Sequence, residues 1–337
     1  MNACAYSFHG LNLIVRGEDA VLTALHARLG RFSPGNTQEE AAGLHFEFHK
    51  VADDSRHVIN RPPGPGRRVF DPGLGELAYF DESQQLYLEV PERGRALCDV
   101  NSRRVHVSYP ESEASDPWLL AHLFFTVPLA ELLKRRGLYM VHAAGLAVAG
   151  QGLLVAGQSG AGKTTLALAL LRAGFDFLAD DTVFLSLGKN GLRILAFPDE
   201  VDVTAQTLGF FPELQRLTHT SKPSGRLKQA ICATSLYQVR PCWECEPEAI
   251  IFPQPGKSSR SILAPMPKPE ALVLLVCNVL RTEPSSSQAH LDALARLVRN
   301  CRCYRLHTGY DFDRLPDLLR PVLEKADCLP EEEETLP

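Results

Sequence analysis

The chain has 337 residues, of which 45% are apolar and 22% are charged, and its formal net charge is −5. This balance is typical of a globular protein and excludes wholesale disorder and collagen-like repeats. The length predicts about two domains, and the weakly acidic charge excludes a uniformly basic surface for nucleic acid or an anionic membrane.

The sequence predicts neither a membrane span nor a secretory signal. The most apolar stretch, Leu120–Leu133, is interrupted by His122, Pro128 and Glu131. The first residues lack a basic segment followed by an apolar core. We therefore expect a cytoplasmic protein with no membrane or nucleic-acid partner. A homo-oligomer is compatible with the sequence, which does not determine the oligomeric state.

Nine cysteines, an odd number, argue against a complete disulfide framework in a chain of this length. Cys242 and Cys245 form a C-x-x-C pair, and Cys301 and Cys303 a C-x-C pair. Together the two pairs could bind zinc, although C-x-C is the weaker signature. A strand would also place Cys301 and Cys303 on one buried face. We expect reduced thiols and keep the zinc site as the alternative.

Residues 1–115 predict a small α+β domain with antiparallel strands, for which substrate recognition is a hypothesis. An amphipathic helix is expected at Ala20–Leu29, and the Pro- and Gly-rich segment Arg61–Arg68 is expected to form a loop. Strands are expected at Leu11–Val15, His45–His49, Leu77–Phe80, Leu86–Val90 and Val105–Tyr109.

A second domain is expected over residues 116–328. It opens with a helix-start signal at Ser115–Pro117, from which an apolar helix is expected to run to about Arg136. The last residues, 329–337, form an acidic tail without apolar partners for packing.

The second domain contains the motif with the clearest chemistry, G-Q-S-G-A-G-K-T-T at Gly157–Thr165. A β-prone segment at Tyr139–Val148 and a short apolar strand at Leu153–Ala156 precede it, and an unbroken helical run follows. Strand, glycine loop and helix are the context in which G-x-x-x-x-G-K-[ST] binds phosphate. The predicted nucleotide-binding residues are Gly157, Gln158, Ser159, Gly160, Ala161, Gly162, Lys163, Thr164 and Thr165.

The motif predicts ATP and Mg²⁺ as ligands. Backbone N–H groups of the loop and the positive end of the following helix would surround the phosphates. Lys163 would reach the β- and γ-phosphates, and the Thr164 hydroxyl would bind Mg²⁺.

Two aspartates follow the next expected strand, Phe175–Ala179. Asp180 and Asp181 would lie at a strand end, where α/β sheets hold their ligands. One carboxylate can bind Mg²⁺ while the other accepts a proton, although a solvated turn explains an Asp-Asp pair as well. His142 is by itself a common structural residue, but a hairpin over 139–156 would bring it to the strand end that carries the glycine loop.

These three elements resemble the core of the HPr kinase/phosphorylase family, whose fold is related to phosphoenolpyruvate carboxykinase. The resemblance is carried by His142, the loop Gly157–Thr164 and the L-A-D-D of Leu178–Asp181. It covers about residues 139–185 and extends weakly through Ile250–Pro253 and Tyr304–Asp311. It implies an α/β P-loop kinase domain of the HPr kinase/phosphoenolpyruvate carboxykinase type.

By this resemblance Asp180 is the proton acceptor, Asp181 a metal-binding or neighbouring carboxylate, and His142 an active-site partner, with exchanged roles for the two aspartates left open. Catalysis is thus assigned to Asp180, Asp181, His142 and Lys163, and metal binding to Thr164 and Asp181.

The chain departs from the family after the acidic pair. The family signature of the type L-E-I-R-G-L-G is missing, and A-F-P-D-E-V-D-V stands at the corresponding place, Ala196–Val203. Glu200 or Asp202 would have to replace the metal-binding glutamate of the family. The missing signature leaves HPr as substrate and phosphorylase activity open. It makes the chain look more like related enzymes that phosphorylate free serine or a serine of a ribosomally made peptide, such as a lasso precursor.

A basic segment, Ser221–Gln229, brings together Lys222, Arg226 and Lys228. Such a loop can close over a transferred phosphate or hold an acidic substrate group, and an exposed solvated loop is the equal alternative.

The sequence thus predicts an ATP-dependent kinase that transfers the γ-phosphate to a hydroxyl, with the serine of a peptide or protein as the expected acceptor. A small-molecule alcohol such as free serine is the first alternative. A nucleotide-hydrolysing switch and a nucleotide-stabilised peptide-binding protein are the others.

Overall fold

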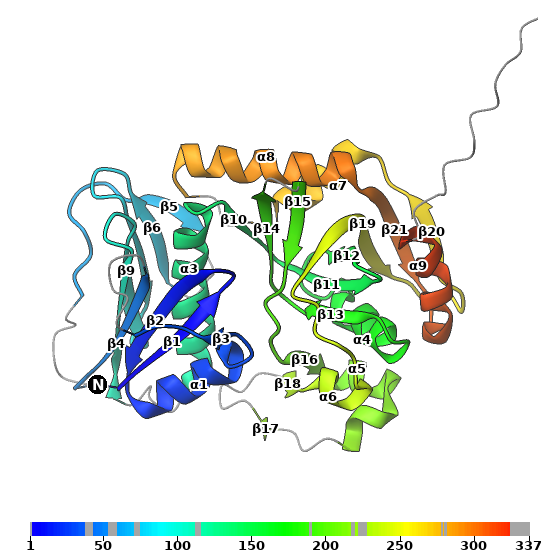
Figure 1. Cartoon of the computed structure of the whole chain (residues 1–337), viewed down its shortest axis with the longest axis horizontal. Helices are drawn as coiled ribbons and strands as arrows, with labels where there is room; N and C mark the ends of the chain where they lie inside the picture. Colours follow the sequence, from blue (N-terminus) through cyan, green and yellow to red (C-terminus); the bar gives the residue numbers. More distant parts are fainter. Residues whose placement is uncertain are drawn as a thin grey trace, which may run out of the picture.

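The computed structural model describes residues 2–37, 43–52, 59–70, 75–111, 116–188, 191–216, 220–221, 228–277, 279 and 282–323. Two large β-sheets lie side by side, each covered by helices (Figure 1). Within the described residues, no helix is both long and apolar enough to cross a membrane. The acidic tail 329–337 and the basic residues Lys222 and Arg226 lie outside the described residues.

The first sheet has the strand order β3-β1-β2-β4-β9-β8-β7-β6-β5. Most neighbours are antiparallel, as expected, but β4 is parallel to both β2 and β9. The sheet is therefore mixed, because the chain crosses over through helix α1 (Asp19–Leu29) between β2 and β4. The strands are β1 (Asn2–Phe8), β2 (Leu11–Gly17), β3 (Ser33–Pro34), β4 (Leu44–Val51), β5 (Arg67–Phe70), β6 (Glu76–Phe80), β7 (Gln85–Val90), β8 (Gly94–Asp99) and β9 (Arg104–Pro110).

One face of this sheet is covered by α1 and by a continuous helical segment. The segment comprises α2 (Pro117–Leu119), the π-helical η2 (Leu120–Phe124) and α3 (Phe125–Lys134). Phe124, Phe125 and Leu129 are completely buried in the core that this sheet forms. This helical segment, which the sequence assigned to residues 116–328, therefore packs on the first sheet.

The second sheet has the strand order β10-β14-β15-β19-β12-β11-β13, with β21 beside β19 and β20 beside β21. The segment predicted as one strand at 139–148 is two strands that separate at His142: β10 pairs with β14, whereas β11 pairs with β12 and β13. The bounds are β10 (Leu138–Val141), β11 (Ala143–Val148), β12 (Gln151–Ala156), β13 (Asp176–Ala179), β14 (Val183–Gly188), β15 (Gly191–Leu195), β19 (Glu244–Pro255), β20 (Ile262–Pro265) and β21 (Arg302–Thr308).

Helices cover both faces of the second sheet, which explains why its central strand β12 is apolar without alternation. Leu153 and Val155 pack toward α4 and α9, whereas Leu154 and Ala156 pack toward α7 and α8. These helices are α4 (Lys163–Arg172), α7 (Lys268–Val276), α8 (Pro284–Asn300) and α9 (Leu315–Leu323).

A small third sheet, β16-β18-β17, lies next to the glycine loop side of the second sheet (Figure 1). Short helices connect it to the rest of the unit. The remaining elements are β16 (Val201–Thr204), α5 (Ala205–Phe210), η3 (Pro212–Arg216), β17 (Thr220–Ser221), β18 (Lys228–Ile231), α6 (Ala233–Tyr237) and η4 (Phe312–Arg314).

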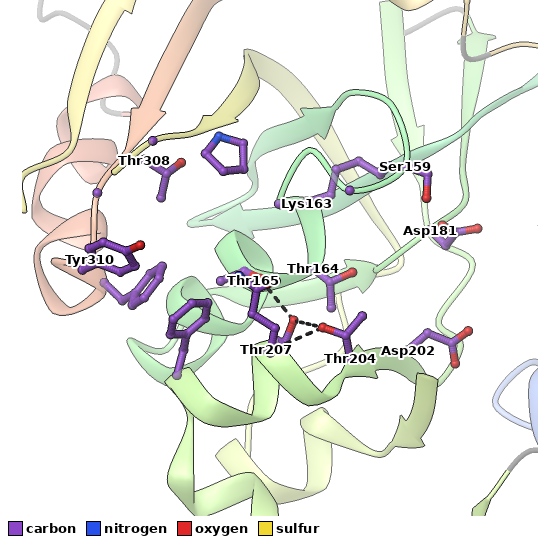
Figure 2. A pocket seen from close by; sticks show the side chains of 18 of the residues that line it. Ser159, Lys163, Thr164, Thr165, Asp181, Asp202, Thr204, Thr207, Thr308 and Tyr310 are labelled. Atoms are coloured by element: carbon purple, nitrogen blue, oxygen red, sulfur yellow. Dashed lines mark hydrogen bonds between the residues drawn. The ribbon is translucent and has the colours of Figure 1, made fainter. Parts of the chain in front are cut away.

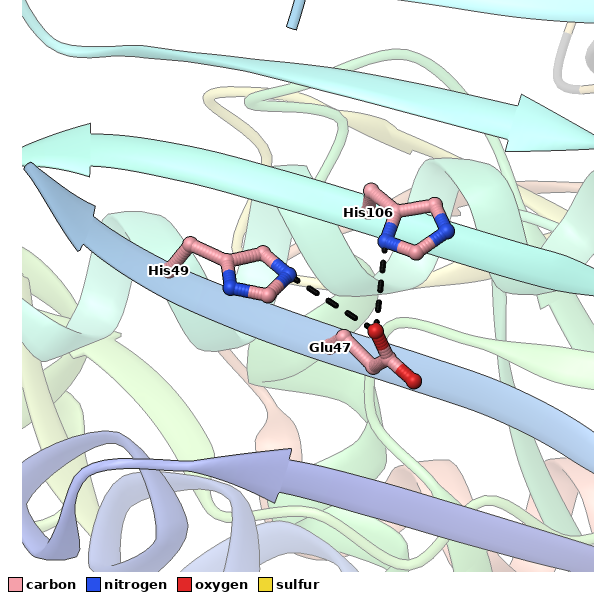
Figure 3. A group of neighbouring side chains, drawn as sticks. All are labelled: Glu47, His49 and His106. Carbon is pink, nitrogen blue, oxygen red and sulfur yellow. Dashed lines mark ion pairs between the residues drawn. The ribbon is translucent and has the colours of Figure 1, made fainter. Parts of the chain in front are cut away.

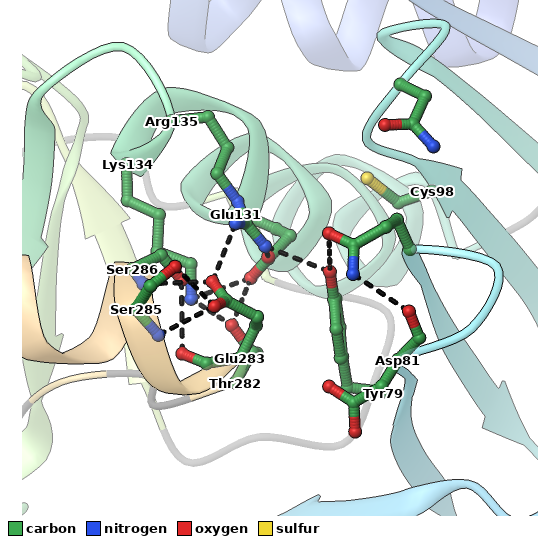
Figure 4. Close-up of polar contacts among 12 residues, drawn as sticks. Tyr79, Asp81, Cys98, Glu131, Lys134, Arg135, Thr282, Glu283, Ser285 and Ser286 are labelled. Carbon is green, nitrogen blue, oxygen red and sulfur yellow. Dashed lines mark hydrogen bonds and ion pairs between the residues drawn. The ribbon is translucent and has the colours of Figure 1, made fainter.

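The two large units are joined by a buried ionic cluster between α3 and the start of α8 (Figure 4). Glu131 is completely buried, and its carboxylate lies 2.7 Å from Lys134 Nζ and 3.0 Å from Arg135. The Thr282 hydroxyl donates a third bond to it at 2.7 Å. Arg135 also pairs with Glu283 at 2.7 Å, which ties α3 to α8.

Candidate active site

The glycine loop connects β12 directly to α4, as the sequence predicted. Gly157 and Gly162 have φ angles of +153° and +93°, in the region that residues with a Cβ rarely adopt. Gly162 occupies the N-cap position of α4, so the loop ends where the free N–H groups of the helix begin. The backbone is therefore arranged as an anion-binding helix N-terminus.

Lys163 is the first residue of α4 and is held against the loop itself. Its Nζ donates hydrogen bonds to the carbonyl oxygens of Gly157, at 2.8 Å, and of Gln158, at 3.3 Å. The ammonium group is thus kept at the concave side of the loop, within the cavity that the loop borders.

Asp180 lies behind the loop and contacts Thr164. The Thr164 hydroxyl donates a hydrogen bond of 3.1 Å to Asp180 Oδ2. Asp180 is only 4% exposed, and its Oδ1 has no hydrogen-bond partner among the described residues. Burial, followed by the nearby charge of Asp181, raises the pKa of Asp180 to about 7, and the Thr164 bond only partly opposes this.

Asp181 has the opposite environment. Its side chain is 69% exposed, and its Oδ1 lies 3.2 Å from Nδ1 of His142. The pairing follows from the strand break at His142, because β10 and β11 diverge there beside the end of β13. The structure thus brings together the histidine and the second aspartate that the sequence singled out, at the surface rather than in the interior.

A cavity of about 390 Å³ connects these groups (Figure 2). Its lining includes His142, Lys163, Thr164 and Asp181, but not Asp180, which is covered by its neighbours. Its volume falls within the range of small-molecule and cofactor sites. A ligand in this cavity would contact Asp181 directly, whereas Thr164 would lie between the ligand and Asp180.

The segment that replaces the missing family signature contributes to the same cavity. Asp202, on β16, lines it, whereas Glu200 is exposed and does not. Thr204 caps α5 by accepting a 3.1 Å hydrogen bond from the N–H of Thr207, and Thr207 also contacts Thr165 at 3.4 Å. Of the two acidic candidates in this segment, only Asp202 lies where it can act on a bound ligand.

Sequence reasoning missed an aromatic wall on the far side of the cavity. Phe210 from α5 contacts Phe312 and Tyr310, with ring centroids 4.8 and 6.2 Å apart. Tyr310 is exposed, and all three rings line the cavity. The weak family resemblance at Tyr304–Asp311 could have drawn attention to Tyr310. Nothing in the sequence singled out Phe210 or Phe312.

The residues present fit both predicted ligands. The loop and helix N-terminus suit phosphate oxygens, and the buried, unpartnered Oδ1 of Asp180 beside the Thr164 hydroxyl suits a divalent cation. The cysteine pairs give no comparable case for zinc. Cys245, Cys301 and Cys303 are buried in an apolar core, and no cysteine belongs to a metal-compatible group within the described part of the chain.

Comparison with known proteins agrees with this geometry. Residues 136–194 match the family model described as the HPr Serine kinase C-terminal domain. Over this segment the chain is HPr-kinase-like. The matched residues include His142, the glycine loop and both aspartates, so the resemblance inferred from these motifs is confirmed, whereas its weak extension toward Asp311 lies outside the match.

Two further comparisons complete the picture. Among solved structures, the chain is similar to the HPr(Ser) kinase/phosphatase from Coxiella burnetii, with 20% sequence identity and a TM-score of 0.25. The similarity covers 38% of this chain and 62% of that one, so the chain spans less than two thirds of that protein's length. No curated protein matches the chain in sequence.

Proposed function

We propose that the chain is an ATP-dependent kinase that transfers the γ-phosphate to a hydroxyl group, with a serine of a peptide or protein as acceptor. The observation that carries the proposal is the position of two unlike carboxylates at one glycine loop. Asp180 is buried against Thr164, and Asp181 is exposed to the cavity beside His142. The family match to an HPr Serine kinase domain supports serine as the acceptor.

The nucleotide is proposed to span the cavity from the loop to the aromatic wall. Loop N–H groups and Lys163 would bind the β- and γ-phosphates. The adenine would stack on the aromatic wall, where Tyr310 is exposed. Thr164 and Asp180 would hold Mg²⁺, with Asp202 as a further carboxylate at the cavity; when bound, this ion neutralises charge on the phosphate oxygens.

The resemblance implied that Asp180 accepts the proton and Asp181 binds the metal. The same geometry favours the reverse assignment. An acceptor hydroxyl in the cavity can reach Asp181, whereas the carboxylate of Asp180 is covered. In the proposed step the acceptor oxygen forms a bond to the γ-phosphorus while the bond from phosphorus to the bridging oxygen breaks. ADP leaves with that electron pair, and the hydroxyl proton passes to Asp181, which His142 orients.

The test uses radiolabelled ATP with Mg²⁺ and two acceptors, free serine and a mixture of serine-containing peptides. We expect acid-stable phosphoserine in one acceptor, and none with Lys163→Ala, which should also lose ATP-induced thermal stabilisation. Lys268→Ala, which removes an exposed lysine at the start of α7 that does not line the cavity, serves as the matched control and should retain both.

Other outcomes would count against the proposal. ATP hydrolysis at the same rate with and without acceptor would favour a hydrolysing switch. Nucleotide binding without turnover would favour a nucleotide-stabilised binding protein. Full ATP-induced stabilisation of Lys163→Ala would show that the nucleotide binds elsewhere.

A further inference from the structure

A second polar cluster lies on the first sheet, on the face opposite α3. Glu47 and His49 are two residues apart on β4 and therefore point to the same side of the sheet. His106 on β9 stands directly opposite Glu47 in the parallel register. Their strand neighbours Phe46 and Phe48 point the other way, into the core.

The three side chains converge on one point (Figure 3). His106 Nδ1 lies 3.3 Å and His49 Nε2 3.7 Å from the same oxygen of Glu47, Oε2. The imidazole rings are nearly parallel, with centroids 5.9 Å apart. All three potential ligand atoms lie within 4.8 Å of one another, and no other such group was found in the described part of the chain.

From this convergence we propose that Glu47, His49 and His106 bind one Zn²⁺ ion. Zinc–ligand bonds of about 2.0–2.2 Å in a tetrahedron separate the ligand atoms by roughly 3.3–3.5 Å. The His106 to Glu47 distance already has this value, and the His49 ring needs only a small approach. Two imidazoles and one carboxylate are a zinc ligand set, whereas Mg²⁺ and Ca²⁺ prefer oxygen ligands throughout.

A neighbouring arginine orients the carboxylate of Glu47 toward the two histidines. Arg104 Nη1 donates to Oε1 of Glu47 at 3.3 Å, which leaves Oε2 turned toward the two rings. Such bonds to the second atom of a ligand fix its orientation and raise affinity.

Solvent access leaves room for a fourth ligand. The side chains of His49 and His106 are 31% and 39% exposed, so water can complete the tetrahedron. Ser108, which is opposite His49 in the register, has a buried hydroxyl without a hydrogen-bond partner among the described residues. The ion would connect β4 to β9 in the middle of the sheet, and this site is independent of the proposed kinase activity.

The experiment titrates Zn²⁺ into the full, metal-free chain in the absence of nucleotide, against a chromophoric chelator. We expect one strong site per chain. Glu47→Gln, His49→Ala and His106→Ala should each weaken it by at least about 10–100-fold, the loss seen when even a supporting partner of a ligand is removed. His307→Ala, which removes an exposed histidine on β21, is the matched control and should bind as the wild type does.

Two further readouts separate this site from the cysteines and from misfolding. Co²⁺ should give the visible absorption of a tetrahedral nitrogen and oxygen site without a sulfur charge-transfer band. Zn²⁺ should raise the Tm of the wild type and of His307→Ala but not of Glu47→Gln, since a ligand stabilises only the state that binds it.

Three results would overturn the proposal. These are the absence of a strong site in the wild type, unchanged affinity in the three ligand variants, and a sulfur charge-transfer band that reassigns the metal to thiolates.

Discussion

Glu131 at the junction of the two units and Asp180 behind the glycine loop are both buried carboxylates, 0% and 4% exposed. Glu131 is surrounded by partners: two cationic side chains and the hydroxyl of Thr282. Asp180 has one hydroxyl on one oxygen and no partner on the other among the described residues. A buried charge that is completely paired holds structure together, whereas one that is incompletely paired is available to a ligand.

The pKa of Asp180 reflects its incomplete pairing. Burial favours the neutral form of this carboxyl group and raises its pKa to about 7. At the junction, burial lowers the pKa of Lys134, and the charge of Glu131 opposes this change. Charge compensation therefore occurs within the protein at the junction, whereas at the glycine loop it would come from the proposed Mg²⁺.

The largest effect is expected from Asp181→Asn. Loss of the proton acceptor should reduce single-turnover phosphoryl transfer by about 10²–10⁴-fold. ATP affinity should change little, because the loop and Lys163 provide most of it. Asp180→Asn should instead shift the Mg²⁺ concentration needed for half-maximal rate. If Asp180→Asn abolishes transfer at saturating Mg²⁺ and Asp181→Asn does not, the roles are those that the resemblance first implied.

Glu131→Gln should give the largest loss of stability. It leaves Lys134 buried without its countercharge, at a cost of about 3–5 kcal/mol in the free energy of unfolding. Asp180→Asn makes the same chemical change at a carboxylate that has one hydroxyl partner and no ion pair among the described residues, and in metal-free buffer it should be neutral or slightly stabilising. Urea denaturation of both variants measures the difference. Equal losses would contradict the contrast between paired and unpaired charge.

A double variant, Glu131→Leu with Lys134→Met, sharpens the same point. Replacing a buried ion pair with apolar groups of similar size often restores or improves stability. We expect the double variant to be more stable than Glu131→Gln and to retain ATP binding, since the junction lies apart from the cavity.

The next prediction concerns Glu283, which lies at the start of α8 and pairs with Arg135 at the junction. Burial disfavours its ionised form, but hydrogen bonds from Ser285 and Ser286 outweigh this and lower its pKa to about 2. Because the folded pKa lies below the ordinary value, the stabilisation is complete above about pH 4.5 and is lost as the pH falls toward 2. Glu283→Gln should lower the free energy of unfolding by about 1–2 kcal/mol at neutral pH and should weaken the fall in stability between pH 4.5 and 2. If the variant loses stability over this pH range as the wild type does, Glu283 is not the group that titrates there.

The smallest effect is expected from Thr204→Ala, at a polar group of the cavity that is already satisfied within the protein. Loss of the α5 cap should cost about 1 kcal/mol. Thermal unfolding measures this cost, and single-turnover kinetics should detect only a small change in transfer. A rate loss as large as that of Asp181→Asn would place Thr204 among the groups that contact the substrate.

Sequence reasoning identified the glycine loop, Lys163 and the acidic pair because their geometry is local. A short buried strand, glycines with positive φ and a helix N-terminus determine the loop with little help from the rest of the chain. The neighbourhood of His142 was also foreseen, since a hairpin is a short-range structure. The break of the strand at His142 was not, because β10 and β11 select different partners that are distant in sequence.

The sheet that buries the helical segment at 117–134 did not follow from the sequence, for a related reason. Its apolar pattern predicts a buried helix but does not name the sheet that buries it. The aromatic rings of Phe210 and Phe312 are likewise ordinary core residues in the sequence, and they meet only because α5 and η4 pack together.

By itself the sequence determined a glycine loop between a strand and a helix, an acidic pair after the next strand and a likeness to HPr kinases. Only the tertiary structure decided which carboxylate is buried, which one faces the cavity, and that Asp202 rather than Glu200 joins them. Only the tertiary structure places Thr282 in contact with Glu131, and His106 beside Glu47 and His49. The physical reason is that burial and charge pairing depend on contacts between distant segments, which local residue patterns do not encode.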